Sequence, residues 1–302
     1  MRKGLLVLVV LAVVLPACAS STSTSSPAAS ASFATATDCA QAATFVTDGK
    51  LTVGTDNPAY PPYFGGGTLS GSDWKINDPS TGKGFESAVA YEVAKRMGFS
   101  PSDVTWVVVP FTQSYAPGPK NFDLDINQIS YSTKRAQEVD FSESYYDVNQ
   151  AIVVQKGTPI ASATSVADLA QYKLAAPLGT TSSDLISSYI GAQPGTFQTL
   201  RDAVAAVNAG QADGLVVDYP TALYMADPYV QQVHDSTVLA QFPNSAVEGG
   251  EYFGTVQAKG STLTPCIDLA LQEMKADGTL QSITTEWLSK KTNVGEVPVW
   301  SK

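Results

Sequence analysis

A strand, a helix and a second strand follow one another early in the chain, and this succession most limits its possible folds. Residues 50–56 have the pattern of a strand that ends in a polar turn. From 85 to 97 apolar residues recur at helical spacing, with Glu86 among the charged residues of the opposite face, and Gly98 ends the pattern. Residues 104–109 are typical of a buried strand. Strand, helix and strand in this order predict a parallel sheet covered by helices, an α/β fold.

The N-terminus has the pattern of an export signal. Two basic residues precede an apolar run from 5 to 15, which is too short to span a bilayer. Residues 15–18, Leu-Pro-Ala-Cys, look like a bacterial lipobox, so Cys18 would become the lipidated first residue and carry palmitate. We expect residues 1–17 to be a signal peptide and 18–37, rich in Ser, Thr and Ala, to be a tether. The alternative is an ordinary secretory signal with an incidental Cys18.

The chain has three cysteines. If Cys18 carries the lipid, Cys39 and Cys266 remain as a pair in an oxidising compartment, which predicts a disulfide. The bond would join the start of the folded part to the helix expected at 263–276. The alternative is two separate buried thiols.

Charge and motif content exclude several classes of function. The net charge of −10 argues against nucleic acid as a partner, because phosphates would be repelled. The sequence has no Gly-x-Ser-x-Gly elbow, no Gly-rich phosphate loop and no His-Glu-x-x-His motif. It contains one histidine, which makes a Ser-His-Asp triad an unfavourable hypothesis. We therefore expect a protein that is not an enzyme and holds neither a metal nor a cofactor.

The stretch from 128 to 146 carries the strongest functional signal. Residues 130–135 read Ser-Tyr-Ser-Thr-Lys-Arg, and residues 139–145 read Val-Asp-Phe-Ser-Glu-Ser-Tyr. The order and spacing of these motifs resemble those of the bacterial extracellular solute-binding proteins of family 3, which capture polar amino acids for ABC importers. The resemblance covers residues 50–288. The chain departs from it at Pro117-Gly118-Pro119, where the family more often has a helix.

The resemblance implies a two-lobed periplasmic-binding-protein type II fold. Each lobe would be a mostly parallel sheet flanked by helices, and two crossover hinge strands, near 145–154 and 251–258, would join the lobes. We expect lobe 1 to comprise 38–148 plus 255–302, and lobe 2 to comprise 149–254.

Loops at the carboxyl ends of parallel strands form the binding crevice of such sheets. A guanidinium fork suits a carboxylate and an acidic side chain suits an ammonium group. The resemblance implies that Arg135, Ser130 and the amide of Thr181 hold a ligand carboxylate and that Asp218 holds the ammonium. The remaining expected contacts are Gln128, where the family often has Gly or Ser, the rings of Tyr60 and Phe111 around the ligand side chain, and Asp56 at its far end.

These expectations describe a lipid-anchored binding protein on the outer face of the cell membrane, or on the periplasmic side in a two-membrane bacterium. It would act as a monomer, close on a polar amino acid, by hypothesis a basic one, and deliver it to an ABC permease. One alternative is a cyclohexadienyl dehydratase-like lyase on the same fold, with Asp56 as its acid. The other is an amino-acid-sensing module of a signalling receptor. For single residues, a helix cap is the alternative role of Asp218 and Thr181, and a turn cap that of Asp56.

Overall fold

The computed structural model describes residues 33–247, 249–289 and 295–302. Its helices are α1 (Ala36–Ala42), α2 (Phe85–Arg96), α3 (Phe111–Ser114), α4 (Val166–Leu169), α5 (Thr181–Leu185), α6 (Leu200–Asn208), α7 (Tyr219–Ala226), α8 (Thr264–Ala276) and α9 (Thr279–Thr284). Its strands are β1 (Leu51–Thr55), β2 (Val104–Val108), β3 (Leu124–Asp125), β4 (Val139–Phe141), β5 (Tyr146–Asp147), β6 (Gln150–Gln155), β7 (Leu174–Pro177), β8 (Gly195–Phe197), β9 (Gly214–Asp218), β10 (Ser236–Phe242), β11 (Tyr252–Phe253) and β12 (Val256–Ala258). Short 3-10 turns lie at Pro79–Thr81, Pro101–Asp103, Arg135–Gln137, Pro159–Ser162 and Asn244–Ala246, and π-helical turns at Ile186–Ile190 and Thr285–Ser289. The expected signal peptide and the lipid-bearing Cys18 lie outside the described residues.

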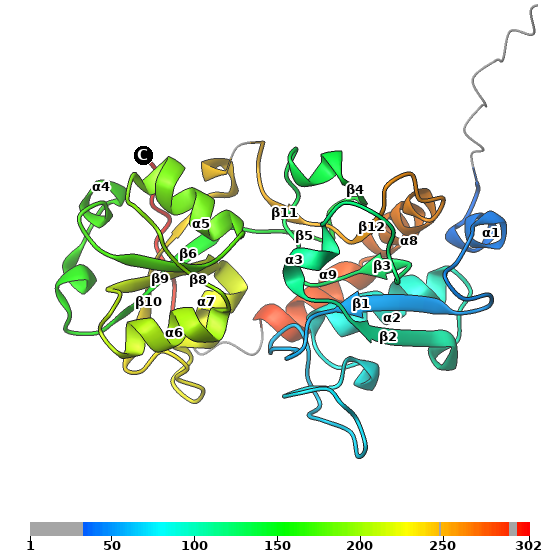
Figure 1. Cartoon of the computed structure of the whole chain (residues 1–302), viewed down its shortest axis with the longest axis horizontal. Coiled ribbons are helices and arrows are strands. Elements are labelled where there is room, and N and C mark those ends of the chain that lie inside the picture. Colours follow the sequence, from blue (N-terminus) through cyan, green and yellow to red (C-terminus); the bar gives the residue numbers. More distant parts are fainter. Residues whose placement is uncertain (1–32, 248, 290–294) are drawn as a thin grey trace, which may run out of the picture. The chain divides into compact units, whose positions relative to one another are not determined.

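The first sheet has the strand order β2-β1-β3-β12-β4 among the described residues (Figure 1). Strand β1 pairs in parallel with β2 and with β3, as the strand–helix–strand pattern predicts. Strand β12 enters antiparallel between β3 and β4. The sheet is therefore mixed, because the strand that returns late in the chain runs against the others.

The second sheet has the order β10-β6-β9-β7-β8 in the described part of the chain. Strands β7, β8 and β9 are parallel neighbours, whereas β6 pairs antiparallel with both β9 and β10. Strand β10 therefore runs in the same direction as β7, β8 and β9, and β6, which continues from the first crossover, runs against them. The sheet is mostly parallel, as expected, with one reversed strand.

Alternating side chains of the second sheet bury two separate cores. Ala151 and Val153 of β6 face a cluster formed with α6 and α7, whereas Ile152 and Val154 face a cluster formed with α4 and α5. All four side chains are fully buried. A strand that is covered on both faces favours apolar residues at successive positions, which explains the apolar run 151–154 in the middle of this strand.

A small two-stranded sheet marks the two places where the chain passes between the larger sheets. Strand β5 precedes β6, strand β11 precedes β12, and β5 pairs antiparallel with β11. These strands lie inside the two expected crossovers. Phe253 of β11 is fully buried, and its ring packs against Tyr145 and Tyr146.

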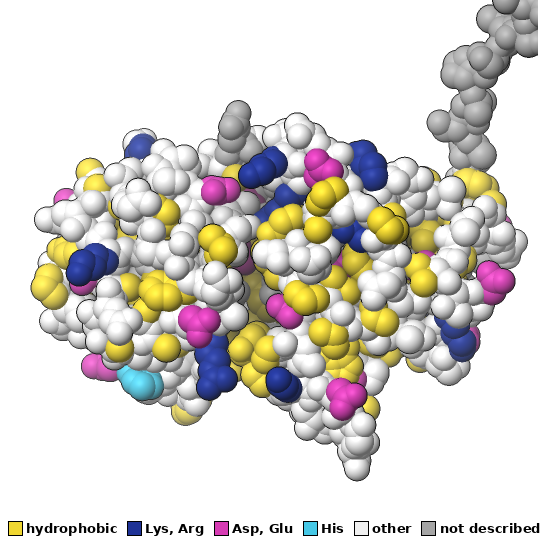
Figure 2. All heavy atoms as spheres, in the orientation of Figure 1, with side chains coloured by type: hydrophobic (Ala, Val, Ile, Leu, Met, Phe, Trp, Pro, Cys, Tyr) yellow, Lys and Arg dark blue, Asp and Glu magenta, His cyan; other side chains and the backbone are white. Residues whose placement is uncertain are grey.

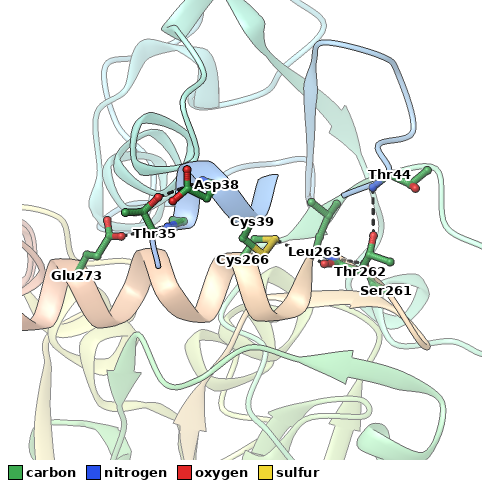
Figure 3. Close-up of a disulfide and its surroundings, with 10 residues drawn as sticks. Thr35, Asp38, Cys39, Thr44, Ser261, Thr262, Leu263, Cys266 and Glu273 are labelled. Atoms are coloured by element: carbon green, nitrogen blue, oxygen red, sulfur yellow. Dashed lines mark hydrogen bonds between the residues drawn. A yellow bond between two sulfur atoms is a disulfide. The ribbon is translucent and has the colours of Figure 1, made fainter. Parts of the chain in front are cut away.

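The expected disulfide between Cys39 and Cys266 is confirmed. It joins α1 to α8 across 227 residues of sequence (Figure 3). Two hydrogen bonds flank it: the amide of Ala36 donates to Glu273 Oε1 over 3.1 Å, and the amide of Thr44 donates to Thr262 Oγ1 over 3.1 Å. The disulfide and its neighbours therefore attach α1 to α8.

Both ends of the described chain differ in detail from the expected boundaries. Helix α1 begins at Ala36, inside the stretch 18–37 expected as a tether, and Ala36 is fully buried. Near the C-terminus, Val299 pairs with Gln241 of β10, and the ring of Trp300 packs against the second sheet. These last residues contact the second sheet, although the sequence pattern placed them with the first lobe. No helix of the described residues is long and apolar enough to cross a membrane.

Candidate functional site

One cavity of about 630 Å³ is lined by residues from loops of both five-stranded sheets. Figure 2 shows a hollow near the centre of the drawn face, bordered by hydrophobic, acidic and basic side chains. The cavity is lined by all eight residues singled out from the sequence: Asp56, Tyr60, Phe111, Gln128, Ser130, Arg135, Thr181 and Asp218. A volume of this size is within the usual range for small-molecule sites, roughly 300–1,000 Å³.

Strand ends place most of these residues. Asp56 follows β1, Thr181 begins the helix after β7, and Asp218 is the last residue of β9. Gln128 and Ser130 lie just after β3. The carboxyl ends of neighbouring parallel strands meet at one edge of a sheet, so side chains distant in sequence converge there.

A smaller cavity of about 230 Å³ is lined by residues between Val108 and Phe122, including Pro117 and Pro119. None of the eight residues named above lines it. The loop that departs from the family pattern therefore borders this second cavity and does not line the larger one.

Arg135 is almost fully buried and is held on several sides. Its Nη1 donates to the main-chain oxygen of Ser130 over 2.6 Å, and its Nη2 donates to that of Gly179 over 2.9 Å. The guanidinium lies 4.3 Å from the ring centre of Tyr115 and 5.5 Å from that of Phe111. Burial lowers the pKa of Arg135, but an arginine remains charged at neutral pH. The guanidinium has five N–H donors, so donors remain for a ligand beyond these two hydrogen bonds and the one it makes with the Tyr115 side chain.

Asp218 does not act as a helix cap, which was the alternative explanation for an acid at this position. It stands at the start of α7, but its side chain makes no capping hydrogen bond. Instead, Asp218 Oδ1 accepts from Gln150 Nε2 over 2.6 Å. Burial, with the nearby charge of Glu251, raises the pKa of Asp218. A cation beside this carboxylate would favour its charged form.

Thr181 is likewise not the cap of its helix. The neighbouring Thr180 caps α5, since its Oγ1 accepts from the amide of Ser183 over 3.3 Å. The Thr181 hydroxyl points instead to Glu251 and donates to Oε1 of its carboxylate. Asp56, by contrast, does accept from the adjacent amide of Asn57 over 2.7 Å, and burial raises the pKa of the Asp56 carboxyl. The turn-capping role suggested for Asp56 is therefore present alongside its place in the cavity wall.

Gln128 is held by an acid that the sequence pattern placed on the charged face of its helix. Glu86 of α2 is fully buried, and its carboxylate accepts from the Gln128 amide over 2.6 Å, from the Gln128 side chain, and from the hydroxyl of Tyr145. Burial is the main cause that raises the pKa of Glu86 to about 7. Glu86 thus fixes Gln128, whose φ of 48° is unusual for a residue other than glycine.

Glu251 is the residue of this region that sequence reasoning missed. It is 1% exposed and lies directly before β11. Its Oε1 accepts from Ser130 Oγ over 2.6 Å, from Gln150 Nε2 over 3.0 Å and from the hydroxyl of Thr181. Burial is the main cause that raises the pKa of Glu251. Its position at the edge of the second crossover was the only signal in the sequence.

A hydrogen bond at the cavity wall joins the two halves of the structure. The hydroxyl of Tyr63 is 2.9 Å from that of Thr221, which lines the cavity from α7. Among the described residues no group of three or more His, Cys, Asp and Glu side chains is arranged to hold a metal ion. The cavity wall carries a guanidinium, carboxylates and hydroxyl groups, which can form hydrogen bonds and charge pairs with an organic molecule.

Three features define the class of protein: two sheets that each contain a reversed strand, two paired crossovers, and a cavity lined from both sheets. This is the architecture of the type II periplasmic-binding proteins, which are also its neighbours among solved structures. An ancestral arginine-binding protein bound to arginine has a TM-score of 0.62 and 28% identity, with 80% of this chain and 99% of that chain covered. The ancestral amino-acid-binding protein AncCDT-1, a precursor of cyclohexadienyl dehydratase, also has a TM-score of 0.62, with 27% identity and coverage of 80% and 96%.

Sequence comparison gives the family. The profile of the bacterial extracellular solute-binding proteins, family 3, matches residues 51–290, and the chain belongs to this family. A curated relative is the ABC transporter glutamine-binding protein GlnH of Bacillus subtilis, which is 28% identical over 221 residues, 71% of this chain and 77% of the relative. These relatives are binding proteins.

Proposed function

We propose that this protein binds an amino acid in the 630 Å³ cavity and delivers it to the membrane subunits of an ABC importer. One observation carries the proposal: Arg135 and Asp218, of opposite charge, come from different sheets and line the same cavity. An α-amino acid has one carboxylate and one ammonium group, which are the partners these two side chains require. The glutamine-binding and arginine-binding relatives support the choice of ligand class.

In this arrangement the remaining donors of Arg135 hold the ligand carboxylate. The amide of Thr181 adds a donor, because the first amides of a helix have no acceptor within the helix. Asp218 holds the ammonium group. Contacts from both sheets would favour the closed form over the open one, since a ligand shifts such an equilibrium only through contacts that differ between the two states.

The far end of the cavity suits a polar side chain that carries a positive charge. Tyr60 and Phe111 offer rings, and Asp56 offers a carboxylate beside them. A guanidinium or ammonium group near Asp56 would favour the ionised form of this acid, whose pKa burial raises. A basic amino acid such as arginine therefore has a partner for each of its charges.

Calorimetry with L-arginine, L-lysine, L-glutamine and L-glutamate tests the proposal. We expect binding to at least one of them, with arginine or lysine tightest. If glutamate binds most tightly, the hypothesis of a basic ligand is wrong. If none of the four amino acids binds, the hypothesis of an amino-acid ligand fails for this panel. Native mass spectrometry of freshly purified protein identifies a ligand that co-purifies.

A lyase is the second candidate, because AncCDT-1 is described as a precursor of cyclohexadienyl dehydratase. Asp56 is the acid available for proton transfer at the far end of the cavity. Incubation with prephenate or arogenate separates the two hypotheses: release of carbon dioxide and water with formation of the aromatic product would establish the enzyme. We expect neither compound to be consumed.

We also propose that a lipid on Cys18 anchors the monomeric protein to the membrane and that residues 19–35 act as its tether. The lipobox pattern at 15–18 supports this. A Cys18→Ala variant expressed with its signal peptide should appear in the medium or soluble fraction. Membrane retention equal to that of the unchanged protein would contradict the anchor.

A further inference from the structure

The hydroxyl hydrogens of Ser130 and Thr181 both point away from a ligand. Each hydroxyl has a single hydrogen, and both donate to Oε1 of Glu251, Ser130 over 2.6 Å. Gln150 Nε2 donates to the same oxygen over 3.0 Å and to Oε2 over 3.1 Å. If Glu251 carried a proton on Oε2, its Oε1 would still be an acceptor. The hydroxyls of Ser130 and Thr181 would therefore still donate to Glu251.

The two hydroxyl oxygens lie 3.4 Å apart, and with their hydrogens directed to Glu251 they can only accept hydrogen bonds from a ligand in the cavity. Ser130 and Thr181 line the cavity wall, and the nearly inaccessible Glu251 lies behind them. Asp218 lines the same wall and accepts from the same Gln150 amide over 2.6 Å. This end of the cavity thus presents three acceptors side by side: two hydroxyl oxygens and a carboxylate.

We propose that Glu251 is a positioning residue that makes this end of the cavity select an ammonium group and reject a carboxylate. By taking the two hydroxyl hydrogens, Glu251 turns Ser130 and Thr181 into acceptors that join Asp218 around a primary ammonium. The inference rests on the proposed function and changes one part of it: the Ser130 side chain faces the ammonium, and the ligand carboxylate is left to Arg135 and main-chain amides.

The charges around the pair agree with this assignment. Arg135 is the cation near both Glu251 and Asp218, and Asp218 also lies near the acid Glu86 and the phenols of Tyr63 and Tyr146. Two carboxylates with a single guanidinium leave one negative charge uncompensated when both acids are ionised. A ligand ammonium supplies the missing positive charge, whereas a second carboxylate placed here would add to the repulsion.

The test separates the two ends of the ligand. Calorimetry compares agmatine, which is arginine without its carboxylate, with desamino-arginine, which lacks the ammonium, and uses the corresponding pair derived from glutamine. In the unchanged protein we expect the amine of a pair to bind more tightly than the acid. In Glu251→Gln the ratio of the two affinities should move toward the acid by roughly tenfold, because the charge behind the hydroxyls is lost. A purely structural role would weaken both analogues equally and leave the ratio unchanged, which would overturn the proposal.

Two further variants keep the test sharp if Glu251→Gln does not fold. Thr181→Val removes one hydroxyl with little change of shape, and Thr55→Val makes the same change at a buried threonine that does not line the cavity, as a control. Thr181→Val should weaken the amine several-fold and leave the acid nearly unchanged, whereas Thr55→Val should change neither. Selective weakening of the acid by Thr181→Val would show that the hydroxyl donates to a carboxylate and would refute the inference. If none of the four analogues and neither parent amino acid binds, the proposed function itself fails, an outcome distinct from binding with an unchanged ratio.

Discussion

Arg135 Nη2 donates a hydrogen bond of 2.9 Å to the main-chain oxygen of Gly179. Arg135 lies in the turn before β4 of the first sheet, and Gly179 lies between β7 and α5 on the second sheet's side. The bond therefore joins elements of the two sheets beside the cavity that Arg135 lines. A ligand carboxylate that engages the guanidinium would bind at the point where the two sides already meet.

Replacing Arg135 by alanine should weaken amino-acid binding by several kcal/mol, because a ligand carboxylate would be left buried without its charged partner. Calorimetry with the tightest amino acid measures the loss. Lys134→Ala is the matched control, since this neighbouring cation is exposed and does not line the cavity. Affinity of Arg135→Ala within twofold of the unchanged protein would refute the role of Arg135.

Asp218→Ala should also cost several kcal/mol of binding free energy, here through the unpaired ammonium. The binding losses of Asp218→Ala and Arg135→Ala should depend on different ends of the ligand. An amine without a carboxylate should be sensitive to Asp218→Ala and much less sensitive to Arg135→Ala. Equal sensitivity of that amine to both changes would contradict the assignment of opposite ligand ends to these residues.

Removing the disulfide should destabilise the fold. It closes a segment of more than two hundred residues between Cys39 and Cys266, for which the loss of chain entropy corresponds to about 5 kcal/mol of free energy of unfolding, while removal of a native disulfide typically costs about 2–5 kcal/mol. Denaturant unfolding of Cys39→Ser/Cys266→Ser should show this loss relative to the oxidised protein. Dithiothreitol should lower the stability of the unchanged protein and leave the double variant unaffected. Equal stability of the two proteins without reductant would contradict the prediction.

The buried acid Glu86 should make stability depend on pH. Its folded-state pKa of about 7 lies above its usual value of 4.5, so the folded state retains a proton that the unfolded state releases between these pH values. The contribution of Glu86 is therefore largest below pH 4.5, falls as the pH rises, and is lost above about pH 7, a change on the order of 3 kcal/mol. Melting curves should show that Glu86→Gln flattens this slope. An unchanged slope in the variant would exclude Glu86 as its source.

Gly84 should tolerate no side chain. Its φ is 100°, and an added Cβ would lie 2.4 Å from Phe64 Cα and from the main-chain oxygen of Tyr63. Gly84→Ala should cost about 3 kcal/mol or more, because backbone atoms must move. Gly67→Ala is the control: its φ is 75°, and nothing lies within 4 Å of the added Cβ. Gly67→Ala should lower the free energy of unfolding by only about 1–2 kcal/mol. Similar losses for Gly67→Ala and Gly84→Ala would contradict the prediction, because they would show that the backbone around Gly84 relieves the clash without cost.

Local patterns in the sequence determine most of the elements. The helical spacing at 85–97 becomes α2 (Phe85–Arg96), because a residue's neighbours three and four positions away decide which helix face is apolar. Asp56, Thr181 and Asp218 lie at strand ends, and the carboxyl ends of parallel strands meet at one edge of a sheet. The eight expected residues therefore reach one cavity, while their contacts with a ligand stay predictions.

Only the tertiary structure decides what surrounds these residues. Glu86 has the pattern of a surface residue, and Glu251 stands in a polar loop, yet both are buried. Their partners are far away in sequence: Tyr145 is 59 residues from Glu86, and Ser130 is 121 residues from Glu251. No short stretch can indicate such a contact, because the burial that makes these carboxylates important arises only when distant segments pack together.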